Sequence, residues 1–152
     1  MGIAEGRPRY GPTVSLVLDS SITLAWVYAE ETTPFILDVL DRVSDAGSWV
    51  PSLWPLEVGN ILEMGVRRHR HDAAFRDATL ADLALLPIRI DRETEHHAWG
   101  STLLLAERHR LALYDAAYLD LALRRGLPLA TLDAELRHAA SAENVPLLGM
   151  AF

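Results

Sequence analysis

The chain has 152 residues, of which 50% are hydrophobic and 23% are charged, a composition typical of one folded globular domain. It contains no cysteine, which excludes disulfides, thiolate catalysis and cysteine-based zinc sites. All 14 basic residues are arginines, and the absence of lysine excludes a P-loop and lysine Schiff-base chemistry. The net charge of −7 argues against a broadly basic nucleic-acid-binding surface.

No apolar run in the sequence is long enough to cross a membrane. The longest uncharged stretch near the start covers only residues 20–29. Residues 1–13 contain Glu5, Arg7 and Arg9 and lack the apolar centre of a signal peptide. We therefore expect a tail over residues 1–13, one domain over residues 14–152 and a cytoplasmic location.

Short apolar runs alternate with helical patterns along the chain. The runs predict five strands, at residues 14–18, 48–50, 88–90, 127–130 and 145–148. Capping residues and helical periodicity predict helices at residues 20–29, 34–46, 53–69, 73–85, 92–109, 114–125 and 133–142. This alternation predicts an α/β domain in which helices cover both faces of a parallel sheet.

Four acidic residues interrupt segments that otherwise resemble core. Asp19 ends the first predicted strand and Asp133 closely follows the fourth, at the sheet edge where parallel α/β proteins bind ligands. Glu57 and Asp115 lie in the first turns of predicted helices. Asp120 lies five residues after Asp115, about 140° around the same helix, and we expect it on the solvent face.

Each acid taken alone has a simpler explanation, because carboxylates cap and stabilise helix N-termini. Taken together, however, four neighbouring carboxylates repel one another unless a divalent cation is present. Hard oxygen ligands favour Mg²⁺ or Mn²⁺, and such sites typically hydrolyse phosphodiesters with a metal-activated water.

Four segments resemble the motifs of PIN-domain ribonucleases, and in particular of VapC-type toxins of type II toxin–antitoxin systems. They read VLDSS at 17–21, EVGNIL at 57–62, YDAAYL at 114–119 and LATLD at 129–133. The resemblance extends from residue 14 to residue 148. It implies a three-layer α/β/α domain with a central parallel sheet of about five short strands, and cleavage of RNA that depends on Mg²⁺ or Mn²⁺.

The resemblance also implies roles for individual residues and partners. Asp19 and Asp115 would be the principal metal ligands, and Glu57 and Asp133 would complete the acidic pocket. Polar side chains that orient these carboxylates would be Ser20, Asn60 and Thr131. A homodimer silenced by a VapB-type antitoxin is the assembly that the family implies.

One compact basic run, Arg67, Arg68 and Arg70, closes the helix that carries Glu57. It has two explanations, a helix C-terminus that favours cations or a contact with RNA phosphates. Two other functions also stay open: a catalytically inactive PIN-fold binding module, and a nuclease of similar fold that acts in RNA processing or on DNA.

Overall fold

The computed structural model describes residues 14–150, so the predicted tail at residues 1–13 lies outside the described residues. The described part contains one sheet of five parallel strands in the order β3-β2-β1-β4-β5. The strands are β1 Leu16–Leu18, β2 Ser48–Pro51, β3 Ile88–Asp91, β4 Leu129–Ala130 and β5 Leu147–Leu148. The predicted sheet is thereby confirmed.

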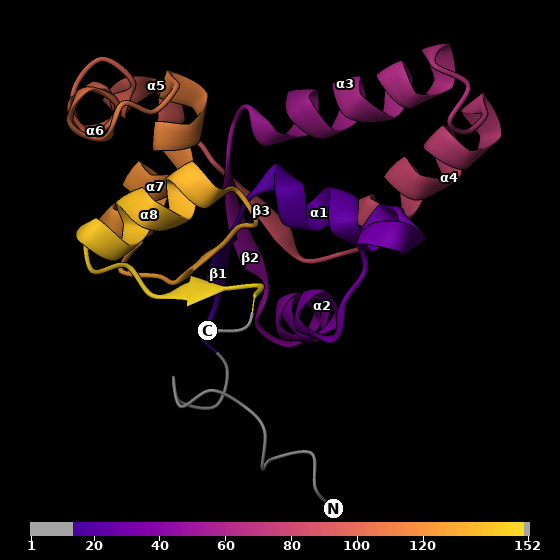
Figure 1. Cartoon of the computed structure of the whole chain (residues 1–152), viewed down its shortest axis with the longest axis horizontal. Coiled ribbons are helices and arrows are strands. Elements are labelled where there is room, and N and C mark those ends of the chain that lie inside the picture. The colour runs from indigo at the N-terminus through magenta and orange to yellow at the C-terminus, as the bar shows by residue number, and fades with distance from the viewer. Residues whose placement is uncertain (1–13, 151–152) are drawn as a thin grey trace, which may run out of the picture.

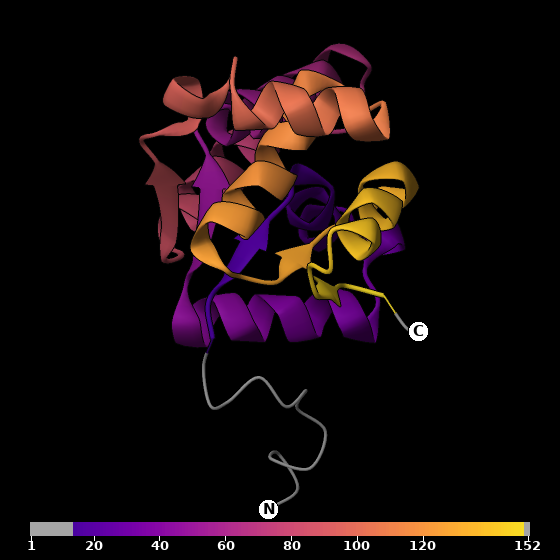
Figure 2. The same cartoon turned by 90° about the vertical axis from the view of Figure 1, so that its left-hand side faces the viewer.

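Helices connect the strands. They are α1 Ser20–Val27, the 3₁₀ turn η1 Ala29–Glu31, α2 Pro34–Ala46, α3 Trp54–Arg67, α4 Ala73–Ala84, α5 Thr94–His97, α6 Ser101–His109, α7 Leu113–Arg125 and α8 Ala134–Ala142. Helices α1 to α4 lie on one side of the sheet and α5 to α8 on the other (Figure 1, Figure 2). The domain is therefore the predicted three-layer α/β/α sandwich. None of the helices at residues 14–150 is long and apolar enough to span a membrane.

Local sequence signals set several helix ends. Helix α2 begins with Pro34 at its first position, and the Thr33 hydroxyl accepts a hydrogen bond from the Ile36 amide at 3.3 Å. Helix α7 ends at Gly126, whose φ of 63° suits glycine. The single helix predicted at 92–109 is wrong, because the chain leaves the helical conformation before Gly100 and forms α5 and α6 instead.

The direction in which the chain winds reverses between β1 and β4. The chain leaves β1 through α1 and α2 and reaches β2 and β3, whereas β4 and β5 lie on the other side of β1. Leu18 pairs with Ala130, and the Asp19 amide donates to the Ala130 carbonyl at 3.0 Å. In open α/β sheets, ligands bind where the direction of winding reverses in this way. The fold therefore offers a site at the carboxyl ends of β1 and β4.

A buried ion cluster fixes α7 against the sheet. The Arg124 guanidinium contacts Asp91, the last residue of β3, and Asp120 of α7, both at 2.8 Å. The prediction that Asp120 faces solvent is wrong, since only 2% of the residue is exposed. The reason is that α7 packs against the sheet, α6 and α8, so that residues 116–122 are all buried. Arg124 supplies the positive charge that compensates the buried Asp120 carboxylate.

We expect Arg124→Met to lower the free energy of unfolding by about 3–5 kcal/mol, because it leaves two buried carboxylates without a counterion. Urea denaturation monitored by circular dichroism measures this loss. The control is Arg125→Met, because Arg125 is exposed and stacks on the Trp49 ring, a contact worth about 0.5–1 kcal/mol. Equal losses in the two variants would contradict the assignment.

Candidate active site

Four helix N-termini bring the four predicted acids close to the carboxyl ends of β1 and β4. Asp19 is the residue before α1, and Asp133 is the residue before α8. Glu57 lies in the first turn of α3, and Asp115 in the first turn of α7. The charges are close enough to act on one another: Asp19 and Asp115 raise the pKa of Glu57, and Asp133 and Asp19 raise the pKa of Asp115.

Asp19 is the most buried of the four carboxylates. Burial raises its pKa, and the hydroxyls of Ser21 and Thr131 oppose that rise by hydrogen bonding. Both hydroxyls donate to the same oxygen, Oδ2, at 2.6 Å from Ser21 and 2.7 Å from Thr131. The carboxylate is therefore held in one orientation at the end of β1.

Glu57 is held by Tyr118, three residues after Asp115 on α7. The Tyr118 hydroxyl donates to Glu57 Oε1, and the tyrosine is fully buried. Burial and the Glu57 charge both raise the pKa of Tyr118, which keeps the hydroxyl protonated as a donor. Burial also raises the pKa of Glu57, and this hydrogen bond opposes that rise.

Asp115 is half-buried, and its carboxylate accepts no hydrogen bond in the described part of the chain. Burial is the largest cause that raises its pKa to about 6, and the charges of Asp133, Asp19 and Glu135 add to it. Of the four acids it is therefore the one that most lacks a favourable partner for its charge.

Asp133 caps helix α8. Its Oδ1 accepts from the Glu135 amide at 3.0 Å, and its own amide donates to Thr131 Oγ1 at 3.1 Å. The simpler explanation of Asp133 as a helix cap is thus observed, whereas Asp19 makes no such capping bond although it precedes α1. Capping does not neutralise the charge of Asp133, which still acts on Asp115.

No basic side chain compensates these charges. Within residues 14–150 none of the four carboxylates forms an ion pair, whereas the buried acids Asp91 and Asp120 share Arg124. A positive helix N-terminus offsets only part of a full negative charge. The arrangement thus leaves a negative site that a cation can stabilise.

The donor chemistry fits a hard divalent cation, since all four groups are carboxylates. In the described residues no three side chains of this kind are grouped tightly enough to form a preassembled metal site. Hydrogen bonds from Tyr118 and Thr131 and the cap on α8 turn three of the carboxylates toward the protein. Binding of a cation would therefore require side-chain rotation, most freely at Asp115.

The three predicted orienting residues lie in different environments. Thr131 contacts Asp19 directly, and Ser20 is buried within hydrogen-bonding reach of the Tyr118 hydroxyl. Asn60 is exposed on α3, and its side chain makes no hydrogen bond to the described residues. Sequence reasoning missed Ser21 and Tyr118, although Tyr118 follows Asp115 by three residues and so shares its helix face.

The basic run lies far from the acids. Arg67 is ten residues after Glu57 on α3, which places it about 15 Å further along the helix axis. Arg67 pairs with Glu63, and Arg70 pairs with Glu30 and stacks on a tyrosine ring. Arg68 is exposed and forms no ion pair with the described residues. Two of the three arginines thus have carboxylate partners in the protein.

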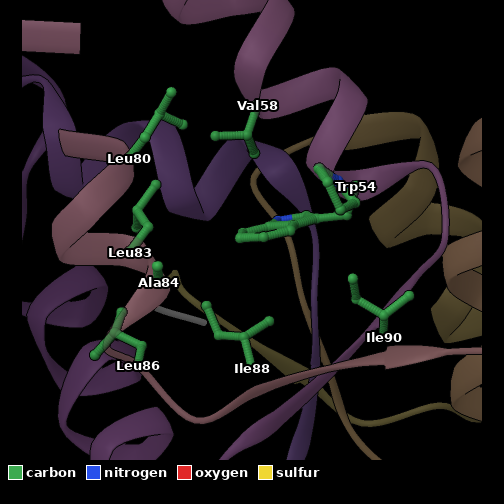
Figure 3. A pocket seen from close by; sticks show the side chains of 9 residues that line it. Trp54, Val58, Leu80, Leu83, Ala84, Leu86, Ile88 and Ile90 are labelled. Carbon is green, nitrogen blue, oxygen red and sulfur yellow. The ribbon is translucent and has the colours of Figure 1, made fainter. Parts of the chain in front are cut away.

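An apolar pocket of about 250 Å³ lies between α3, α4 and β3. Figure 3 shows Trp54, Leu83, Ile88 and Ile90 around its central space. None of its lining residues is titratable, so it can bind apolar groups but cannot supply acid–base or metal chemistry.

Comparison with known proteins agrees with this geometry. The model of the PIN domain family matches residues 16–142. Among similar solved structures is the crystal structure of PAE2754 from Pyrobaculum aerophilum, with a TM-score of 0.62 and 24% sequence identity over 88% of this chain and 86% of that chain. At this identity the likeness shows the fold alone. No curated protein matches the chain.

We expect Asp115→Asn to stabilise the metal-free protein at neutral pH. The pKa of about 6 in the folded state exceeds the ordinary 3.8, so the folded protein binds this proton more tightly than the unfolded chain does. Ionisation above pH 6 therefore costs stability in the wild type, and the variant avoids that cost. The gain is full above pH 6, shrinks as the pH falls toward 3.8 and vanishes below it.

Urea denaturation in EDTA across this pH range measures the gain. Asp41→Asn, which removes an exposed carboxylate from α2, is the matched control and leaves stability within about 0.5 kcal/mol. An Asp115→Asn protein that is no more stable than the wild type at neutral pH would contradict the raised pKa of Asp115.

Proposed function

This chain belongs to the PIN domain family, and on that premise we propose that it is an endoribonuclease that depends on Mg²⁺ or Mn²⁺. PIN domains are generally nucleases that use divalent metal ions, so the family assignment indicates a nuclease. One observation carries the choice of an active enzyme over an inactive binding module: four neighbouring carboxylates without an ion-pair partner in the described chain. A binding module has no need to retain this electrostatic cost.

The acids divide into two principal ligands and two supporting ones. Asp19 and Asp115 would hold the cation, and Glu57 and Asp133 would complete the pocket directly or through water. Bound Mg²⁺ or Mn²⁺ lowers the pKa of water and stabilises the negative charge that develops on the phosphate. The four carboxylates would determine where the cation lies relative to the RNA strand.

Hydrogen-bonded neighbours hold the carboxylates in place. Thr131 and Ser21 donate to Asp19, and Tyr118 donates to Glu57, so the positions of two acids are set before any ligand binds. Such outer partners typically contribute about 10–100-fold to metal affinity or activity. Thr131 has a second role, because its hydroxyl oxygen also accepts a hydrogen bond from the Asp133 amide. Together with its bond to Asp19, this contact connects the residues that follow β1 and β4.

We further propose that the protein is a VapC-type toxin that forms a homodimer and is silenced by a VapB-type antitoxin. The resemblance of the four acidic motifs supports this class. Exposed apolar side chains support a protein partner: Leu56, Leu85 and Ile90 are 77%, 83% and 44% exposed, and Ile90 lines the pocket in Figure 3. Exposed apolar side chains that gather into one patch often mark interaction surfaces.

We expect Asp19→Asn and Asp115→Asn each to abolish cleavage of single-stranded RNA in Mg²⁺ or Mn²⁺, because each removes a charge needed to hold the cation. Denaturing gel electrophoresis of end-labelled RNA measures cleavage, and EDTA should stop the wild type. Asp41→Asn is the control and should cleave normally. Wild-type cleavage that persists in EDTA, or full activity of either site variant, would refute the proposed chemistry, and cleavage of DNA alone would refute the substrate class.

We expect expression of the wild type to arrest bacterial growth, and expression of Asp115→Asn to leave growth unaffected, since arrest by a toxin requires RNA cleavage. Colony counts after induction measure the difference. Co-expression of the antitoxin gene next to this one should restore growth. If the wild type cleaves RNA in vitro but is harmless at high expression, the enzyme acts in RNA processing and the toxin assignment is wrong.

A further inference from the structure

A half-buried arginine near Asp19 has no carboxylate partner among residues 14–150. Arg137 lies on α8, one helical turn after Asp133. Its Nη1 donates to two main-chain carbonyls, that of Thr131 at 2.6 Å and that of Leu148 at 3.1 Å. Burial lowers its pKa, and no acidic group acts to raise it. Five other arginines of the described residues differ in this respect, since each forms an ion pair with a carboxylate: Arg67, Arg70, Arg76, Arg108 and Arg124.

The same residue that holds Arg137 also holds Asp19. Thr131 accepts from Arg137 through its carbonyl oxygen and donates to Asp19 through its hydroxyl. The guanidinium is therefore fixed relative to the acids through one residue.

Arg137 lines a pocket of about 430 Å³. Polar donors come from Arg137, His138 and Ser141, and apolar walls come from Leu132 and Leu147. An arginine has five N–H donors, and Nη1 uses its two on the carbonyls. The donors on Nε and Nη2 contact no protein acceptor in the described residues, so they are available to a ligand.

A nucleic acid strand needs such a cation here. The four carboxylates repel phosphates, and the net charge of −7 adds to the repulsion. A bound metal ion offsets this at the cleaved phosphate only. The neighbouring phosphates must find positive charge in the protein itself, and a guanidinium held by two carbonyls provides it with little loss of side-chain entropy.

We propose that the pocket at Arg137 binds a phosphate of the RNA strand next to the one that is cleaved. The proposal rests on the proposed function, because it assumes that the acids face an RNA backbone. Arg137 is the phosphate-contacting residue, and the apolar wall of Leu132 and Leu147 accommodates the attached ribose or base.

Salt dependence of RNA binding tests this proposal. Binding of a fluorescein-labelled single-stranded RNA is measured by anisotropy with the Asp115→Asn protein, so that no strand is cleaved, between about 50 and 200 mM salt. Adding Arg137→Gln should weaken binding and reduce the slope of log K against log salt by about 0.7, the value for one lost phosphate contact on a single strand. Adding Arg68→Gln, which removes an exposed and unpaired arginine, should leave the slope unchanged.

Arg137→Lys separates charge from structure. Lysine retains a cation that binds phosphate as a point charge, so most of the slope should return. A slope unchanged in Arg137→Gln, or the same loss in Arg137→Lys, would overturn the proposal. Should Arg137→Gln fail to fold, the Nε–H NMR signal of Arg137 in the Asp115→Asn protein must shift on addition of RNA, and an unshifted signal overturns the proposal.

Failure of this inference and failure of the proposed function are distinguishable. Cleavage by the wild type in Mn²⁺ combined with an unchanged slope rejects only the phosphate contact. Absence of cleavage with a reduced slope rejects the nuclease and keeps the contact. Absence of RNA binding at low salt rejects the phosphate contact whatever the cleavage assay shows.

Discussion

Mutual repulsion among four carboxylates is the constraint on which the site depends. Asp19, Glu57, Asp115 and Asp133 come from four separate segments. The charges of Asp19 and Asp115 raise the pKa of Glu57, and those of Asp133 and Asp19 raise the pKa of Asp115. The same protein shows the alternative solution, because the buried Asp91 and Asp120 share Arg124. The acidic site is therefore not a by-product of a chain that pairs its charges poorly. The site retains an electrostatic cost that a bound cation would offset.

The fold tolerates this cost because rigid parts surround it. Burial of the short strands and the Arg124 cluster fix β1 and α7, which carry Asp19 and Asp115. Hydroxyl groups of Ser21, Thr131 and Tyr118 then orient two of the carboxylates without neutralising them. Polar but uncharged neighbours hold a carboxylate in place and leave its negative charge available to a cation. An arginine in the same place would neutralise that charge.

The sequence predicted the sheet, its parallel direction and the two-sided cover of helices, because apolar runs and capping residues are local signals. It also singled out four acids that lie close enough for charge effects among them, since strand ends and helix starts converge at the edge of a parallel sheet, and their role in holding a cation stays a prediction. The partners of individual polar side chains could not be predicted. Asp120 is buried because Arg124 and Asp91 meet it, and Ser21, rather than Ser20, reaches Asp19, and neither fact follows from periodicity.

The central claim is that these four carboxylates form one cation site, and anomalous diffraction from crystals grown with Mn²⁺ tests it most directly. The account predicts an anomalous peak between the carboxylate oxygens of Asp19 and Asp115, with Glu57 and Asp133 at its edge. An anomalous peak elsewhere in the protein, or no peak beside these four carboxylates at saturating Mn²⁺, would contradict the proposed cation site.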